Sequence, residues 1–148
     1  MAPPTRAAAR RDRPLLNANF VVELVAGKGS GFAAVAFGPF TAKPATASPS
    51  LALAPVPLAD RVVLSRGATG APDLYHWWRQ ARDGQAPPRR TVTVKLLADD
   101  HSTVLMTWRL RNAKPVALAY SPLDALEGAV LMETIELAFD DVEITSGA

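Results

Sequence analysis

The sequence of 148 residues contains no cysteine. Disulfide bridges, thiolate catalysis and cysteine-based zinc sites are therefore excluded. The sequence also lacks an apolar run of about 18 residues, which a membrane-spanning helix would need, and residues 1–16 lack the continuous apolar core of a secretory signal. These absences predict a soluble protein that is made in the cytoplasm.

Excess charge is scarce as well, because 16 Lys and Arg residues nearly balance 14 Asp and Glu residues. The net charge of +2 is too small to imply a nucleic-acid partner by itself. The charges are nevertheless unevenly placed, with arginines at the front of the chain and carboxylates at the end. The front set is Arg6, Arg10, Arg11 and Arg13, and the end set is Glu133, Glu136, Asp140, Asp141 and Glu143. The two sets could meet within one subunit or between neighbours.

Hydrophobic residues make up 49% of the chain, which is enough for one domain with a sizeable core. We expect this domain to span residues 15–146. Residues 1–14 are mostly Ala, Arg and Pro, so they cannot bury enough surface to offset the entropy of ordering, and they predict a flexible basic arm. Residues 38–60 carry five prolines, which cannot donate the hydrogen bonds of a central strand. This segment predicts an extended loop.

Alternating apolar side chains predict β-strands along most of the domain. The expected strands are 19–25, 32–37, 61–66, 92–97, 104–110 and 131–144. The glycine-rich residues 27–31 predict a reversal between the first two strands. At Asp140 and Asp141 the alternation of the last strand shifts its phase, which predicts a bulge or bend there.

One helix is predicted at residues 72–83, with Pro72 at its first position and Gly84 at its stop. Its apolar residues recur at helical spacing and predict a stripe that packs on a sheet. They are Leu74, Trp77, Trp78 and Ala81. The predicted fold is therefore mainly β, a barrel or sandwich of about six to eight strands with one flanking α-helix.

No group of residues predicts catalysis, a metal site or a cofactor site. His76 and His101 lie on the helix and in a turn, without a second metal ligand at a recognisable spacing. Residues 27–31 lack the order of a phosphate-binding loop. The surroundings of three serines also differ from a nucleophile elbow. They are Ser30, Ser65 and Ser121.

The carboxylates of the last strand could include a catalytic pair, but Glu133 and Glu136 are three residues apart and so point to opposite faces. A solvated or interface-facing set of charges is favoured. Aromatic residues could stack on nucleic-acid bases, although their spacing on the helix and strand explains most of them as core. They are Tyr75, Trp77, Trp78 and Trp108.

Six segments occur in an order that resembles the tail-tube protein family of contractile phage tails and phage-tail-like contractile injection systems. They are NFVVEL at 19–24, GF at 31–32, LSRG at 64–67, DLYHWW at 73–78, WRLRNAKP at 108–115 and ETIELA at 133–138. The resemblance implies a β-barrel flanked by a helix, whose hexameric rings stack into a hollow tube inside a sheath. The implied role is structural and not enzymatic.

The resemblance also implies the partners. These are further copies of the chain, sheath and baseplate proteins and a cargo in the lumen, with neither membrane insertion nor nucleic acid expected. The particle would be assembled in the cytoplasm and could be released outside the cell. The residues expected at the assembly interface are Lys43, Arg109, Arg111, Glu133, Glu136, Asp140 and Asp141.

Two alternatives stay open. In the family, the segment that corresponds to residues 38–60 is usually a charged, glycine-containing loop that reaches the adjacent ring, whereas here only Lys43 and Asp60 are charged. This departure leaves room for a baseplate protein that initiates the tube. The other alternative is a small nucleic-acid-binding β-barrel that uses the arginine-rich arm and surface aromatics.

Overall fold

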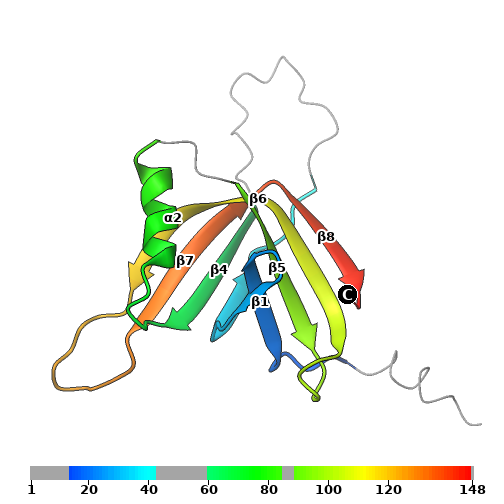
Figure 1. The fold of residues 1–148 in the computed structure, drawn as a ribbon, viewed down its shortest axis with the longest axis horizontal. Helices are drawn as coiled ribbons and strands as arrows, with labels where there is room; N and C mark the ends of the chain where they lie inside the picture. The colour runs from blue at the N-terminus through cyan, green and yellow to red at the C-terminus, as the bar shows by residue number, and fades with distance from the viewer. Residues whose placement is uncertain (1–13, 43–59, 85–88, 148) are drawn as a thin grey trace, which may run out of the picture.

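The computed structural model describes residues 14–42, 60–84 and 89–147. Within these residues the elements are β1 (Phe20–Val25), β2 (Lys28–Ser30), β3 (Ala34–Phe37), β4 (Asp60–Gly67), α2 (Asp73–Arg82), β5 (Arg90–Leu97), β6 (Val104–Tyr120), β7 (Met132–Phe139) and β8 (Asp141–Ser146). The predicted mainly β fold with one flanking helix is confirmed (Figure 1). The predicted basic arm lies outside the described residues except for Pro14, as do residues 43–59 of the proline-rich segment.

All strand pairs are antiparallel, in the order β2-β1-β5-β6-β7-β4-β3, with β8 paired to β6. The 17-residue strand β6 joins the two halves of the sheet. Its first part pairs with β5 and β8, and its last part pairs with β7. One buried cluster contains Val22 and Val94 from the first half together with Leu64 and Ile135 from the second. The two halves therefore share one hydrophobic core.

The last predicted strand is confirmed together with its bend. The chain from β7 through Asp140 to β8 follows β6 in one continuous register, from Lys114↔Ala138 to Arg111↔Asp141. The amide of Asp140 donates to the carbonyl oxygen of Arg111 at 3.0 Å, at the break between the two strands. Beyond this point the alternation changes phase, as the sequence predicted.

The reversal at residues 27–31 differs from the prediction. The chain turns at Gly27, whose φ is 80°, and returns as β2 within the glycine-rich segment. A Cβ atom on Gly29 would lie 2.7 Å from Cγ2 of Val21, so glycine allows a close passage of β2. Residues 34–37 then form β3, which pairs with β4 and not with β1. A tight turn uses so few residues that the hairpin is complete before the next strand begins.

The helix is confirmed, but its buried stripe is narrower than predicted. Pro72 is the residue before the first helical turn, and α2 ends at Arg82. Leu74 and Trp77 are each only 1% exposed, whereas Trp78 is partly buried. The guanidinium carbon of Arg82 lies 5.4 Å from the centre of the Trp78 ring. Trp78 therefore lies at the margin of the interface between α2 and the sheet.

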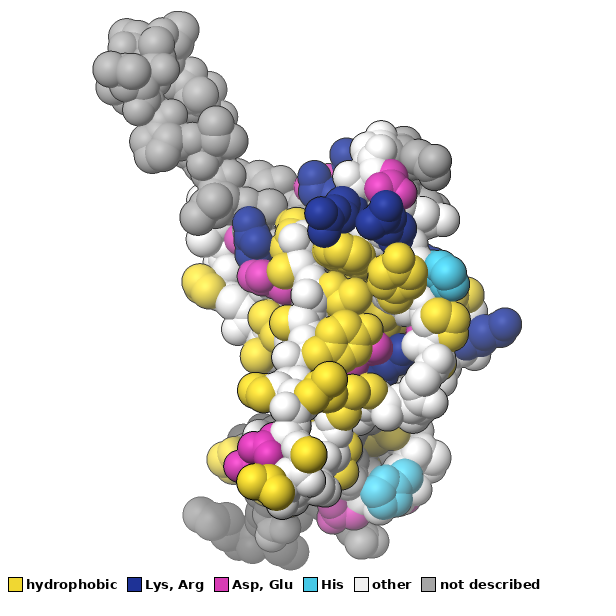
Figure 2. Space-filling view, turned by 90° about the vertical axis from the view of Figure 1, so that its left-hand side faces the viewer, with side chains coloured by type: hydrophobic (Ala, Val, Ile, Leu, Met, Phe, Trp, Pro, Cys, Tyr) yellow, Lys and Arg dark blue, Asp and Glu magenta, His cyan; other side chains and the backbone are white. Residues whose placement is uncertain are grey.

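The loop between β6 and β7 exposes large apolar side chains, which the pattern of the sequence did not predict. Figure 2 shows a face on which apolar side chains form a band below a group of Lys and Arg side chains. The amide of Ser121 donates to the carbonyl oxygen of Met132, and the amide of Met132 donates to Ser121 Oγ, so the base of this loop is fixed. The exposed apolar residues of the loop are Leu123, Leu126 and Val130.

The different burial of the two tryptophans predicts different losses of stability. Trp77→Ala is expected to lower the free energy of unfolding by about 3–5 kcal/mol, because it removes a fully buried aromatic side chain. Trp78→Ala is the matched control and should cost clearly less. Urea denaturation followed by circular dichroism measures both. Equal losses in the two variants would contradict the placement of Trp77 in the core and Trp78 at its margin.

Candidate assembly interface

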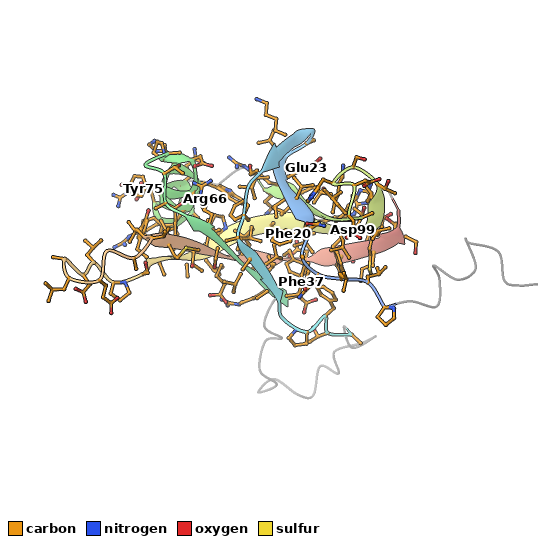
Figure 3. The ribbon with its side chains drawn as sticks, turned by 90° about the horizontal axis from the view of Figure 1, so that it is seen from below. Phe20, Glu23, Phe37, Arg66, Tyr75 and Asp99 are labelled. Carbon is orange, nitrogen blue, oxygen red and sulfur yellow. The ribbon has the colours of Figure 1, made fainter. Side chains whose placement is uncertain are left out.

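Glu133 is the buried centre of a polar network whose outer members reach the surface. Its side chain is 6% exposed and that of Arg66 is 12% exposed. Arg66 Nε donates to Glu133 Oε1 at 3.0 Å, and Tyr120 Oη donates to Glu133 Oε2 at 2.9 Å. Arg66 also donates to both carboxylate oxygens of Asp73, in the first turn of α2. The network therefore connects β4, β6, β7 and α2, and Figure 3 shows Arg66 beside the helix that carries Tyr75.

The position of Glu133 follows from strand pairing. Along β7 it shares a face with Ile135 and Leu137, both completely buried. In the ladder it lies opposite Arg66 of β4 on one side and Tyr120 of β6 on the other. A buried carboxylate needs a cation and hydrogen-bond donors, which these two neighbours supply. The alternation of β7 carried a signal for burial, but the identity of the partners depended on pairing between distant segments.

The network also shifts the pKa of three of its members. The hydrogen bond with Asp73 raises the pKa of Arg66, and the same hydrogen bond lowers the pKa of Asp73. Burial raises the pKa of Tyr120, and the hydrogen bond to Glu133 acts in the same direction. Arg66 and Asp73 are therefore charged, and Tyr120 is neutral, at neutral pH.

A second group of expected interface residues lies on one face of β6 and β8. Arg109 faces Glu143 in the ladder, and Arg111 faces Asp141. Arg111 Nη2 lies 2.6 Å from Glu143 Oε2, with both side chains about half exposed at 48% and 47%. The structure therefore brings Arg109, Arg111 and Asp141 together, and it adds Glu143.

The remaining expected interface residues lie apart from this group. Glu136 is on the face of β7 opposite to Glu133, and its Oε1 is 3.5 Å from Nη1 of Arg61. Asp140 Oδ2 is 3.3 Å from Nη1 of Arg89, at the junction between β7 and β8. Lys43 lies outside the described residues.

Residues 14–42, 60–84 and 89–147 also bear on metal binding and on membrane insertion. No group of three His, Asp or Glu side chains there could hold a metal ion. No helix in the same ranges is long and apolar enough to cross a membrane.

The chain matches the family of the T4-like virus tail tube protein gp19 over residues 54–143. No curated protein matches it. A solved structure of the PVC sheath-tube complex of an extracellular contractile injection system, in the extended state, includes a chain with 18% identity and a TM-score of 0.71; the match covers 97% of this chain and 99% of that one.

Two other solved structures have the same fold. The cap of the anti-feeding prophage matches with 19% identity and a TM-score of 0.69, over 91% of this chain and 93% of that one. Hcp1 from Flavobacterium johnsoniae matches with 18% identity and a TM-score of 0.57, over 87% of this chain and 96% of that one. At these identities the likenesses show the fold, and they agree with the mainly β class predicted from the sequence.

The buried pair of Arg66 and Glu133 predicts a large loss of stability when its cation is removed. Arg66→Met leaves Glu133 buried without a charged partner and is expected to cost about 3–5 kcal/mol in the free energy of unfolding. Arg61→Met, which breaks the more exposed pair with Glu136, is the matched control and should cost less than about 1 kcal/mol. Urea denaturation at neutral pH compares them, and equal costs would contradict the dominant role of the buried pair.

The lowered pKa of Asp73 predicts a pH dependence of stability. Its stabilising contribution is present above the pKa of the unfolded chain, about 3.9, and is lost as the pH falls through the lower pKa of the folded state. The free energy of unfolding should therefore fall below about pH 4. Asp73→Asn should make this fall shallower, measured by urea denaturation between neutral and acidic pH. An unchanged pH profile in Asp73→Asn would contradict the prediction.

Proposed function

The chain belongs to the family of the T4-like virus tail tube protein gp19, and from this premise we propose that its copies form hexameric rings, stacked into the inner tube of a contractile phage tail-like injection particle. Membership confirms the resemblance that the sequence carried. It also confirms the predicted structural, non-enzymatic role, because the family is that of a tail tube protein. The family match over residues 54–143 is the observation that carries the proposal.

The fold comparison supports the proposed partners. One of the similar structures is a sheath-tube complex of an extracellular particle, and the match covers almost the whole of both chains. By analogy the proposed partners are further copies of this chain, a sheath and a baseplate. Assembly in the cytoplasm followed by release in an extracellular particle is part of the same proposal.

Open strand edges give physical support to self-assembly. Within the described ranges, β2 and β3 end the sheet, and β8 pairs with β6 alone. Each of these strands therefore has one edge that pairs with no other strand of the described residues. An uncovered edge promotes uncontrolled pairing with other chains, and closure into a ring is one arrangement that can cover it.

The proposed contact surface is the charged face of β6 and β8, together with the exposed face of β7. No ion pair within the described residues involves Arg109 or Asp141, so both can form pairs with a neighbour. Glu136 and Asp140 would contribute from β7 and the bend. Glu133 would act from inside the subunit by holding Tyr120, and Lys43 remains a proposed contact outside the described residues.

A baseplate protein that initiates the tube is the second candidate. It is favoured by residues 38–60, which are rich in Pro and Ala and have few charges, unlike the usual loop of the family. The number of copies per particle separates the candidates. Many stacked rings identify the repeated subunit, whereas a single ring identifies the initiator.

Electron microscopy of the purified protein tests the proposal. Sixfold rings or tubes are expected in the wild type. Arg109→Glu should reduce their number, because it reverses a charge at the proposed contact, and circular dichroism should show that the subunit stays folded. Arg82→Glu, on the exposed side of α2, makes the same change of charge away from that surface and should leave ring formation intact.

Two results would overturn the proposal. One is a strictly monomeric protein in sedimentation that never co-purifies with sheath or baseplate components. The other is salt-dependent binding to DNA or RNA without any rings, which would favour the nucleic-acid-binding barrel.

A further inference from the structure

A cleft lies between residues 14–19 and the turn that joins β5 to β6. Its volume is about 330 Å³, and its lining includes Pro14, Leu16, Leu97 and Leu105. Leu16 is 72% exposed, although most of the residues that line the cleft are apolar. Figure 3 shows Asp99, which also lines this cleft, at the opposite end of the molecule from Arg66 and Tyr75.

The walls of this cleft are held in place by hydrogen bonds. The amide of Leu97 donates to the carbonyl oxygen of Asn19 at 2.7 Å, which joins one wall to the other. In the turn, Asp100 Oδ1 accepts from the amides of Ser102 and Thr103 at 2.9 and 2.8 Å. The hydroxyl of Thr103 also donates to Asp100 and, as the main cause, holds the pKa of that carboxyl far below its usual range. The cleft is thus a formed site with an ionised carboxylate at its rim.

The acidic rim lacks a cation of its own. Asp99 is exposed, and neither Asp99 nor Asp100 forms an ion pair within the part of the chain that the structure describes. Most carboxylates at the end of the chain do have one. Their partners are Arg66 for Glu133, Arg61 for Glu136, Arg89 for Asp140 and Arg111 for Glu143. Most carboxylates at the end of the chain, which could have paired with the arginine-rich segment, therefore already have a cationic partner. Within the described residues, those of the cleft do not.

We propose that this cleft binds the basic segment 1–13 of a neighbouring copy of the chain. The segment carries four arginines and a single acidic residue, Asp12, so its charge complements the rim. Its other residues are mainly Ala and Pro, whose small apolar side chains suit a leucine-lined cleft. The proposal rests on the proposed function, because assembly into rings and tubes places copies next to one another.

Two features favour a neighbouring copy over the same chain. Pro14 forms part of the wall, and the residue before a proline prefers an extended conformation, which disfavours a sharp return of Arg13 into the cleft. Thirteen residues can span up to about 43 Å when extended, enough to cross to an adjacent subunit. If every copy donates its segment to the next, the contact is head-to-tail and compatible with a closed ring or a stacked tube.

Engineered disulfides test this contact directly, because the chain has no cysteine of its own. Full-length Ala9→Cys, marked with a mass tag, is co-assembled with full-length Ala98→Cys and oxidised. Ala98 lines the cleft, and both substitutions leave every charge in place. Ala9→Cys co-assembled with Ala125→Cys, in the exposed loop between β6 and β7, is the matched control. The mixed disulfide is expected to form several-fold more with Ala98→Cys than with Ala125→Cys.

High salt and a charge variant test the electrostatic part. In 1 M NaCl the screening length falls to about 3 Å, so the yield of the mixed disulfide should drop. Adding Asp99→Lys to the Ala98→Cys chain should lower it too, whereas Glu127→Lys in the same chain should not. Equal yields with Ala98→Cys and Ala125→Cys would overturn the proposal, and so would a disulfide that forms only within a single chain carrying both Ala9→Cys and Ala98→Cys.

Electron microscopy of the same samples separates this inference from the proposed function. Rings or tubes without a preferred link between residues 9 and 98 would refute only the contact between segment and cleft. A preferred link in particles that never form rings or tubes would refute the proposed tube and retain the contact.

Discussion

The fold depends on a bend that neighbouring strands make at the same level. In β6 the bend is at Asn112, whose φ of 55° lies in the left-handed region that asparagine tolerates better than most residues. On the neighbouring strands it is at Asp140, next to the hydrogen bond with the carbonyl oxygen of Arg111. Because the register continues across the bend, β6 keeps its backbone partners. In β6 and in the paired chain from β7 to β8, the alternation of core-facing residues changes its phase at the bend. One long strand can thus serve both halves of the sheet.

The bend explains what the sequence could predict in this region. The phase shift at Asp140 and Asp141 was visible as a break in local alternation. The segment WRLRNAKP was visible as a family marker, and the structure gives its asparagine a conformational reason. Local periodicity also predicted most strands and the helix, since side chains alternate along a strand and recur every three to four residues along a helix.

Pairings between distant segments were beyond the reach of local pattern. Arg66 meets Glu133 across 67 residues of sequence, and no periodicity within either strand identifies the other. The same limit explains why β3 was placed next to the first strand when it pairs with β4. For Trp78, helical spacing gave the correct side of the helix, but the width of the buried stripe depends on how closely the sheet approaches it.

The distribution of charge separates folding from assembly. Inside the subunit, Arg66 and Glu133 satisfy each other in a poorly solvated site, where losing one partner would leave a costly buried charge. At the surface, pairs such as that of Arg111 with Glu143 are exposed and contribute little to stability. The charges without a partner in the described part of the chain, Asp99 among them, can change their environment on association without breaking an existing pair. In the proposed assembly, these residues and the apolar surface beside them are therefore the better contacts between copies, and this is why we propose the cleft, and not the carboxylates of the last strands, as the partner of the basic segment.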